Sequence, residues 1–198
     1  MRHEKHPSQE DMLAHPAPRF ARADASSTMN CVDGIRRPKM NSHVKQTLLR
    51  RLTESHESLR ATLEGVDLET VVYADSGWRI RDIIGHIATW DREIAKALRA
   101  FLAGEVYLTP DIGDDESAFN EQAVAAQRQL STQQILSEWE GARAEFKAAI
   151  EAIPPERFPG DMLYPWGDER GDIAGLVETM IKHDAEHRAD ILHAIRSS

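Results

Sequence analysis

The chain has a single cysteine, Cys31, among its 198 residues. One cysteine excludes an intrachain disulfide framework and is typical of proteins that work in a reducing cytosol. Long apolar runs are also missing: none approaches the length that spans a bilayer, and no apolar signal-peptide core lies near the N-terminus. We therefore expect a cytoplasmic protein that does not enter a membrane.

Basic residues are scarce in most of the chain. Residues 40–198 hold 17 of the 24 Lys and Arg residues and 28 of the 33 Asp and Glu residues, which gives this part a net charge of −11. Because negative charge repels phosphate groups, we expect neither nucleic acid nor an anionic membrane as the main partner.

Several common catalytic motifs are absent too. The sequence has no glycine-rich phosphate-binding loop, and residues 40–198 contain no cysteine that could act as a nucleophile. The zincin motif His-Glu-x-x-His is also missing, because the segment from His183 to His187 has its glutamate directly before the second histidine. These absences leave the histidines as the main candidates for chemistry.

The first segment differs from the rest in composition. Residues 1–39 contain four of the nine prolines, with serines and charged residues between them and no apolar periodicity. Such a composition is typical of disordered chain. We expect residues 1–39 to be a disordered tail or an over-extended translation start, and residues 40–198 to form one domain.

From residue 41 onward, apolar residues recur at helical spacing, and no segment shows strand-like alternation. Ser131 and Asp172 are predicted N-caps, while Gly104 and Pro154 are predicted to end helices. A short helix is predicted to begin near Asp115. Four long amphipathic helices in one domain predict an all-α four-helix bundle. The long helices are predicted over about 41–65, 78–104, 131–153 and 172–196.

Three histidines lie on the apolar stripes of two of these helices. His183 and His187 are four residues apart, so both imidazoles point from one face of the last helix. His86 lies three residues after Ile83 and four before Trp90, on the stripe of the second long helix. The three predict a divalent metal site with one coordination position open for water or substrate. A hydrogen-bonded polar network in the core is the alternative.

Other polar residues near these helices have more ordinary explanations. His56 is either a fourth ligand or proton shuttle, or a core-edge histidine hydrogen-bonded to a carbonyl. Asp190 either orients an imidazole as an acceptor or is a surface carboxylate. Asp82 and Glu93 flank His86 and are expected to be solvated or salt-bridged, and His193 is expected to be exposed.

Two motifs resemble those of the DinB/YfiT-like superfamily. The segment from Gly77 to Ile87, GWRIRDIIGHI, followed by Trp90-Asp91, is similar to the second-helix motif of that superfamily. The pair His183-x-x-x-His187 is similar to its last-helix motif, and the segment from Asp115 to Asn120 resembles the link before its third helix in some members. The resemblance covers about residues 41–196.

This resemblance implies an up-down-down-up bundle, often homodimeric, with zinc, nickel, iron or manganese between His86, His183 and His187. Related branches are the N-terminal domains of mycothiol-dependent maleylpyruvate isomerases and the ClbS/DfsB hydrolases, which often lack the three histidines. The implied function is a metal-dependent enzyme of detoxification or stress response acting on a small molecule. The ion would activate a low-molecular-weight thiol or a water for S-transfer or hydrolysis. A non-catalytic protein that binds a metal or a reactive small molecule is the alternative.

Overall fold

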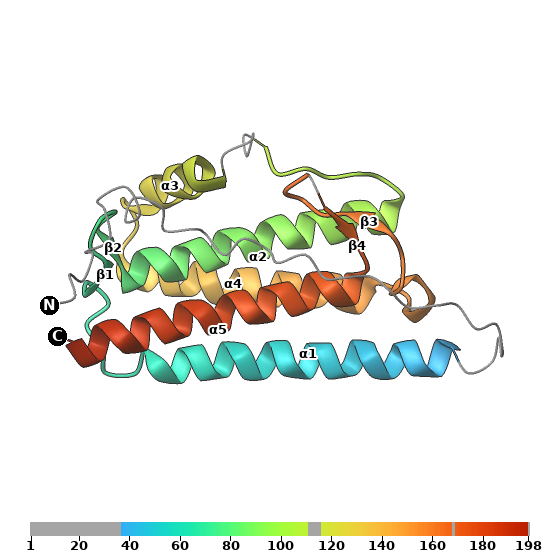
Figure 1. Cartoon of the computed structure of the whole chain (residues 1–198), viewed down its shortest axis with the longest axis horizontal. Helices are drawn as coiled ribbons and strands as arrows, with labels where there is room; N and C mark the ends of the chain where they lie inside the picture. Colours follow the sequence, from blue (N-terminus) through green and yellow to red (C-terminus); the bar gives the residue numbers. More distant parts are fainter. Residues whose placement is uncertain (1–36, 111–115, 168, 198) are drawn as a thin grey trace, which may run out of the picture.

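The computed structural model describes residues 37–110, 116–167 and 169–197. Four long helices lie side by side in a bundle: α1 (Arg37–Thr62), α2 (Ile80–Ala103), α4 (Thr132–Ala152) and α5 (Ile173–Ser197) (Figure 1). Helices α1 and α5 run in one direction, and α2 and α4 run in the other. The predicted all-α four-helix bundle with up-down-down-up topology is confirmed.

The predicted helix ends are set by local chemistry. The Ser131 hydroxyl accepts a hydrogen bond from the Gln134 backbone N–H at 3.3 Å, which caps α4. Gly104 ends α2 with φ of 82°, a left-handed conformation that favours glycine. The Asp172 carboxylate accepts from the Gly175 backbone N–H at 2.7 Å at the start of α5. Helix α1 begins at Arg37, a few residues before the predicted start. Most of the predicted tail or over-extended start, residues 1–39, lies outside the described residues, and its last three positions, 37–39, belong to α1.

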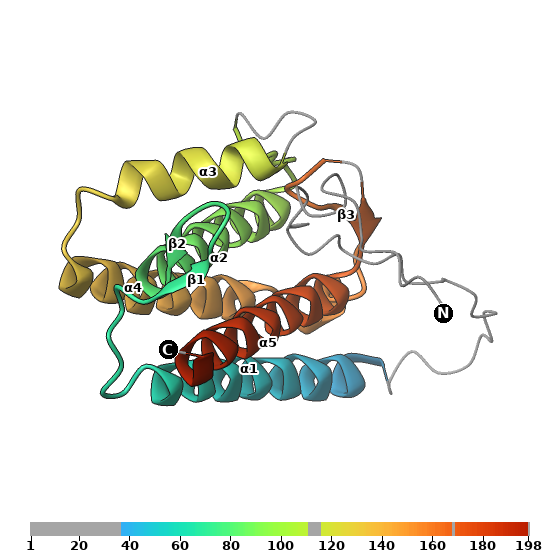
Figure 2. The ribbon, with the colours of Figure 1, turned by 60° about the vertical axis from the view of Figure 1, so that its left-hand side comes forward.

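A fifth helix, α3 (Glu116–Gln127), matches the short helix predicted near Asp115 and packs on α2 (Figure 2). Side-chain hydrogen bonds hold it in place. The Trp90 indole Nε1 donates to Asn120 Oδ1 at 2.9 Å, and Gln127 Nε2 donates to Thr89 Oγ1 at 2.8 Å. Both contacts reach α2 within one turn of His86, so α3 covers the part of α2 that carries this histidine.

Two short antiparallel hairpins interrupt the helical pattern. Strand β1 (Val71–Tyr73) pairs with β2 (Trp78–Arg79), and β3 (Met162–Leu163) pairs with β4 (Arg170–Gly171). A 3₁₀ turn, η1 (Pro155–Arg157), follows α4. The sequence shows no strand-like alternation at these hairpins, because strands of two or three residues are too short to show it.

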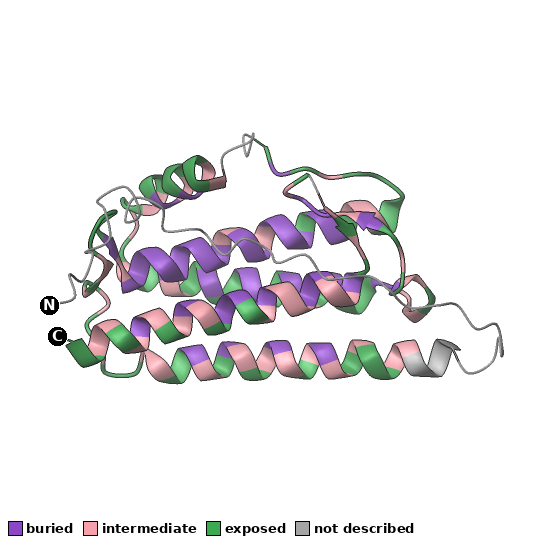
Figure 3. Ribbon diagram, viewed as in Figure 1, coloured by how far each residue is buried: buried purple, intermediate pink, exposed green. Residues whose placement is uncertain are grey.

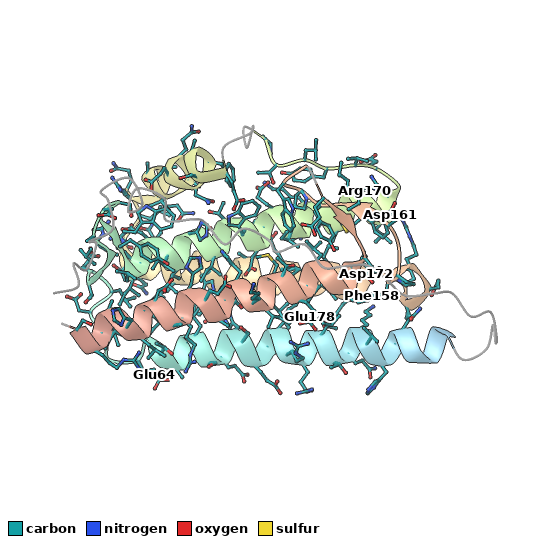
Figure 4. The ribbon with its side chains drawn as sticks, in the orientation of Figure 1. Glu64, Phe158, Asp161, Arg170, Asp172 and Glu178 are labelled. Carbon is teal, nitrogen blue, oxygen red and sulfur yellow. The ribbon has the colours of Figure 1, made fainter. Side chains whose placement is uncertain are left out.

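Side chains at the second hairpin and along α5 are paired across elements (Figure 4). Arg170 of β4 donates from Nε to Asp161 Oδ2 at 3.0 Å, just before β3. Glu178 of α5 forms an ion pair with Arg51 of α1, between two helices that run in parallel.

Helix α2 is the most buried of the long helices (Figure 3). The described core falls into two apolar clusters: one contains Leu52, Trp90 and Phe146, and the other contains Leu59, Ile83 and Trp139. In α1, α4 and α5, buried polar residues occupy positions between the two clusters, and in α2 His86 and Asp91 lie on either side of the change from one cluster to the other. Together they make up a polar layer across the middle of the bundle. Its buried members are His56, His86, Asp91, Arg143, His183, Asp184 and His187.

None of the helices in the described part of the chain combines the length and the apolar character that crossing a membrane requires.

Candidate metal centre

The three predicted histidines converge in this polar layer. His86 reaches in from α2, and His183 and His187 reach in from α5, one helical turn apart. His183 Nε2 lies 3.0 Å from the Nε2 atoms of both His86 and His187. All three side chains are buried, and their ligand atoms lie within 4.8 Å of one another. The structure thus brings together the residues that the helical stripes placed inward; that they bind a metal stays a prediction.

Hydrogen bonds among the three histidines cannot satisfy all of their ring nitrogens. A neutral imidazole nitrogen either carries one hydrogen or presents one lone pair. His183 Nε2 faces two nitrogens and can serve only one of them. The Nδ1 atoms of His86 and His183 have no hydrogen-bond partner among the described residues. Burial without partners is unfavourable for such polar atoms.

A divalent cation fits these donors. Each Nε2 would present its lone pair to the ion, and each Nδ1 would keep its hydrogen. Ligand bonds of roughly 2.0 Å at tetrahedral angles place nitrogens about 3.3 Å apart. The observed 3.0 Å separations are close to that value. The residues present therefore fit a metal ion better than they fit a closed hydrogen-bond network.

Burial also keeps the three imidazoles uncharged. It lowers the pKa of His183 and of His187 to about 3, with the positive Arg143 adding to the effect at His183. Burial lowers the pKa of His86 well below its usual value. Neutral imidazole is the form that binds metal ions, so at pH 7 the site needs no loss of protons before it binds a cation.

The β1–β2 hairpin supplies two aromatic residues to this site. The Trp78 ring lies 5.3 Å from the His86 ring, and Trp78 Nε1 donates to Glu121 of α3 at 2.8 Å. The Tyr73 hydroxyl lies 3.1 Å from His187 Nδ1 and 2.6 Å from Asp190 Oδ2. Asp190 thus reaches His187 through Tyr73. Sequence reasoning missed Tyr73, because neither its short strand nor its distance of 114 positions from His187 gave a signal.

A buried ion cluster lies beside the histidines and was also missed. Arg143 of α4 donates to Asp91 of α2 at 2.7 Å and to Asp184 of α5 at 2.8 and 2.9 Å. Ser55 of α1 donates to the same Asp184 carboxylate at 3.0 Å. A signal was present in the sequence, because the three charged residues fall on the apolar stripes. Each stands four positions after a buried residue: Ile87, Trp139 and Met180.

The remaining polar candidates lie outside the triad. His56 Nε2 donates to Glu140 Oε2 at 3.0 Å, and the ring packs on Trp139, so His56 belongs to the core edge, with a carboxylate in place of the expected carbonyl. It is not part of the group that converges. Asp82 pairs with Arg79 and Glu93 with Lys96, as expected for salt-bridged carboxylates. His193 is exposed, as predicted.

The fold and the site together define a four-helix bundle with histidines from two helices in its core. Four-helix bundles build their metal sites in this way, from side chains on facing helices. The chain belongs to the mycothiol maleylpyruvate isomerase N-terminal domain family, whose match spans residues 49–191 and includes all three histidines. This confirms the resemblance to the DinB/YfiT-like superfamily. No curated protein sequence matches the chain.

Solved structures share the fold at low sequence identity. An uncharacterised protein from Escherichia coli UTI89 is 13% identical with a TM-score of 0.64, over 77% of this chain and 93% of that one. YfiT from Bacillus subtilis, described as a probable metal-dependent hydrolase with an unusual four-helix bundle topology, is 16% identical with a TM-score of 0.61, over 87% and 93%. The mycothiol-dependent maleylpyruvate isomerase is 14% identical with a TM-score of 0.61; the match covers 74% of this chain but only 60% of the isomerase.

Proposed function

We propose that this protein is a metal-dependent enzyme in which His86, His183 and His187 hold one divalent cation. The observation that carries the proposal is the convergence of three buried Nε2 atoms that hydrogen bonds within the triad cannot satisfy. Membership of the isomerase N-terminal domain family and the likeness to YfiT, described as a probable metal-dependent hydrolase, support it.

The donor set narrows the choice of ion and its role. Imidazole nitrogens suit zinc, nickel or iron, whereas calcium and magnesium prefer oxygen ligands; manganese is included through the family resemblance. Three protein ligands leave a coordination position open, which is the arrangement of reactive rather than structural sites. When bound, such an ion supplies Lewis acidity that lowers the pKa of a small thiol or a water toward neutrality.

The chain's own residues prepare the site for that chemistry. Burial keeps the three imidazoles neutral, and the two helices aim their Nε2 atoms at one point. The Trp78 ring packs against the His86 ring, with ring centroids 5.3 Å apart. The reaction we propose is S-transfer or hydrolysis of a small electrophile, in detoxification or stress response.

A small thiol is the proposed co-substrate because the family is named after a mycothiol-dependent enzyme. The isomerase's own substrate is not part of the proposal, because the chain covers only 60% of that enzyme. The acidic balance of the chain, with 33 Asp and Glu residues against 24 Lys and Arg residues, favours a small-molecule partner over nucleic acid.

Metal content tests the proposal directly. Untagged full-length protein, purified without chelator or metal resin, is analysed by inductively coupled plasma mass spectrometry beside His86→Ala and His183→Ala. His193→Ala is the matched control, because His193 is an exposed histidine on the same helix as His183. We expect about one ion per chain in the wild type and the control, and loss of the ion in both triad variants. Metal-free wild type that also fails to bind added zinc, nickel, iron or manganese contradicts the proposal.

A non-catalytic binding protein is the second candidate. It is favoured by one feature: among the described residues, the converging group consists of histidines alone and includes no carboxylate that could act as a general base. The two candidates differ in turnover. Metal-loaded protein is mixed with a small thiol and an excess of an electrophile, and product is counted per chain. More than one product per chain supports the enzyme, and a plateau at one supports the binding protein.

A further inference from the structure

We infer that Tyr73 is a positioning residue for the histidine centre: with Asp190, it fixes the hydrogen of His187 on Nδ1 and leaves the Nε2 lone pair facing His86 and His183. This inference rests on the proposed metal site and adds the β1–β2 hairpin to it. The observation behind it is a chain of two short polar contacts that leads away from the triad, from His187 to Tyr73 and from Tyr73 to Asp190.

The direction of each hydrogen bond follows from the donors available. A carboxylate accepts hydrogen bonds and donates none, so the 2.6 Å contact to Asp190 Oδ2 uses the single hydroxyl hydrogen of Tyr73. The Tyr73 oxygen is then left with lone pairs toward His187 Nδ1, at 3.1 Å. The bond between them forms only when Nδ1 carries the hydrogen. A neutral imidazole with a hydrogen on Nδ1 has its lone pair on Nε2.

Within the described residues, only His187 of the three histidines has such a partner at Nδ1. Nδ1 of His86 and of His183 makes no hydrogen bond to any described residue, whereas Nδ1 of His187 contacts Tyr73. The tautomer of His187 is therefore set by the protein before any ion arrives. Histidine ligands held this way bind metal more tightly, and losing the outer partner typically lowers metal affinity 10- to 100-fold.

The turn and the strand pairing of the β1–β2 hairpin place Tyr73 against His187. Gly77, with φ of 69°, makes the turn, and its N–H donates to the Tyr73 carbonyl at 2.8 Å. Tyr73 pairs with Trp78 across the hairpin, and Trp78 packs on the His86 ring. One hairpin thus contacts a histidine of α2 and a histidine of α5, so it ties together the two helices that form the triad.

The test compares Tyr73→Phe with the wild type in two measurements. Zinc affinity is measured by competition with a chromogenic chelator, and the His187 tautomer of metal-free protein is read at pH 7.5 from long-range ¹H–¹⁵N correlations of the imidazole. Tyr107→Phe is the matched control. It removes the same hydroxyl from a tyrosine that also donates to a carboxylate at 2.6 Å, Glu93 Oε2, and that is not among the described hydrogen-bond partners of the triad.

We expect Tyr73→Phe to bind zinc 10- to 100-fold more weakly and to move the His187 hydrogen partly to Nε2, with Tyr107→Phe unchanged in both readouts. Asp190→Asn should shift both in the same direction by less, and it carries the test if Tyr73→Phe fails to fold. Unchanged zinc affinity and tautomer in the variants, with wild type that binds zinc, overturn the inference alone. Wild type that binds no metal overturns the proposed function, and the tautomer reading then still decides the role of Tyr73.

Discussion

Arg143 and Asp184 form a two-bonded ion pair in the interior of the bundle, with Nη1 to Oδ2 at 2.8 Å and Nη2 to Oδ1 at 2.9 Å. The third guanidinium contact, from Nε, goes to Asp91. One arginine of α4 therefore links α2 and α5 through charged hydrogen bonds. Its partner Asp184 directly follows His183 in the chain. Burial raises the pKa of Asp91, and the positive charge of Arg143 opposes this rise.

Replacing Arg143 should strongly destabilise the protein. Arg143→Met leaves Asp91 and Asp184 buried without their cation, and breaking a buried ion pair in this way costs about 3–5 kcal/mol. Urea denaturation followed by circular dichroism measures the loss. Lys147→Met is the control, because it removes a half-buried cation from the same helix and should cost less than about 1 kcal/mol. Equal stability of the two variants would show that the ion pair contributes nothing.

A divalent ion should raise the melting temperature. A ligand that binds only the native state at 100 times its dissociation constant adds about 2.7 kcal/mol. For a domain of this size that corresponds to roughly 5–10 °C. Differential scanning calorimetry with zinc, and then with excess chelator, measures the shift and its reversal. His187→Ala should show no shift, and a shift of the same size in that variant would place the zinc elsewhere.

Stability of the metal-free protein should rise with pH between about 3 and 6.5. The pKa values of His183 and His187 are lowered to about 3 from 6.5, so the unfolded chain binds more protons across this window. The stabilisation is fully present above pH 6.5 and is lost as the pH falls toward 3. We expect a loss on the order of 1–2 kcal/mol per histidine between pH 7 and 5.

Urea denaturation with chelator at pH 7 and at pH 5 gives this difference. His187→Leu should reduce the pH dependence by the share of one histidine, and His193→Leu, an exposed position on the same helix, should leave it unchanged. The same pH dependence in all three proteins would assign it to other groups.

Removing the partner of Trp90 should weaken the attachment of α3. Asn120→Ala leaves the buried Trp90 Nε1 without the acceptor that it contacts at 2.9 Å, and a buried donor left unsatisfied costs about 1–3 kcal/mol. Gln122→Ala is the control, because it is an exposed amide on the same helix. Denaturation followed by tryptophan fluorescence measures both, and a loss in Gln122→Ala as large as in Asn120→Ala would contradict the argument.

The sequence by itself determined the bundle and the inward direction of the triad. Apolar residues at helical spacing define the buried face of each helix, and any residue on that stripe, polar or not, must point inward. Ile83, His86 and Trp90 share one stripe, so burial of His86 could be predicted without coordinates. Capping is equally local, which is why Ser131 and Gly104 stand where the chain predicts them.

Only the tertiary structure decided which polar groups meet. Tyr73 contacts His187 across 114 positions, and Arg143 contacts Asp91 and Asp184 across 52 and 41. Such contacts depend on how helices are rotated and how a three-residue strand is placed, and no local period encodes either. His183 and His187 could be paired from their spacing, because one helix carries both. Their partner from α2 and the phenol behind His187 are brought in by packing, the step that joins distant segments of the chain.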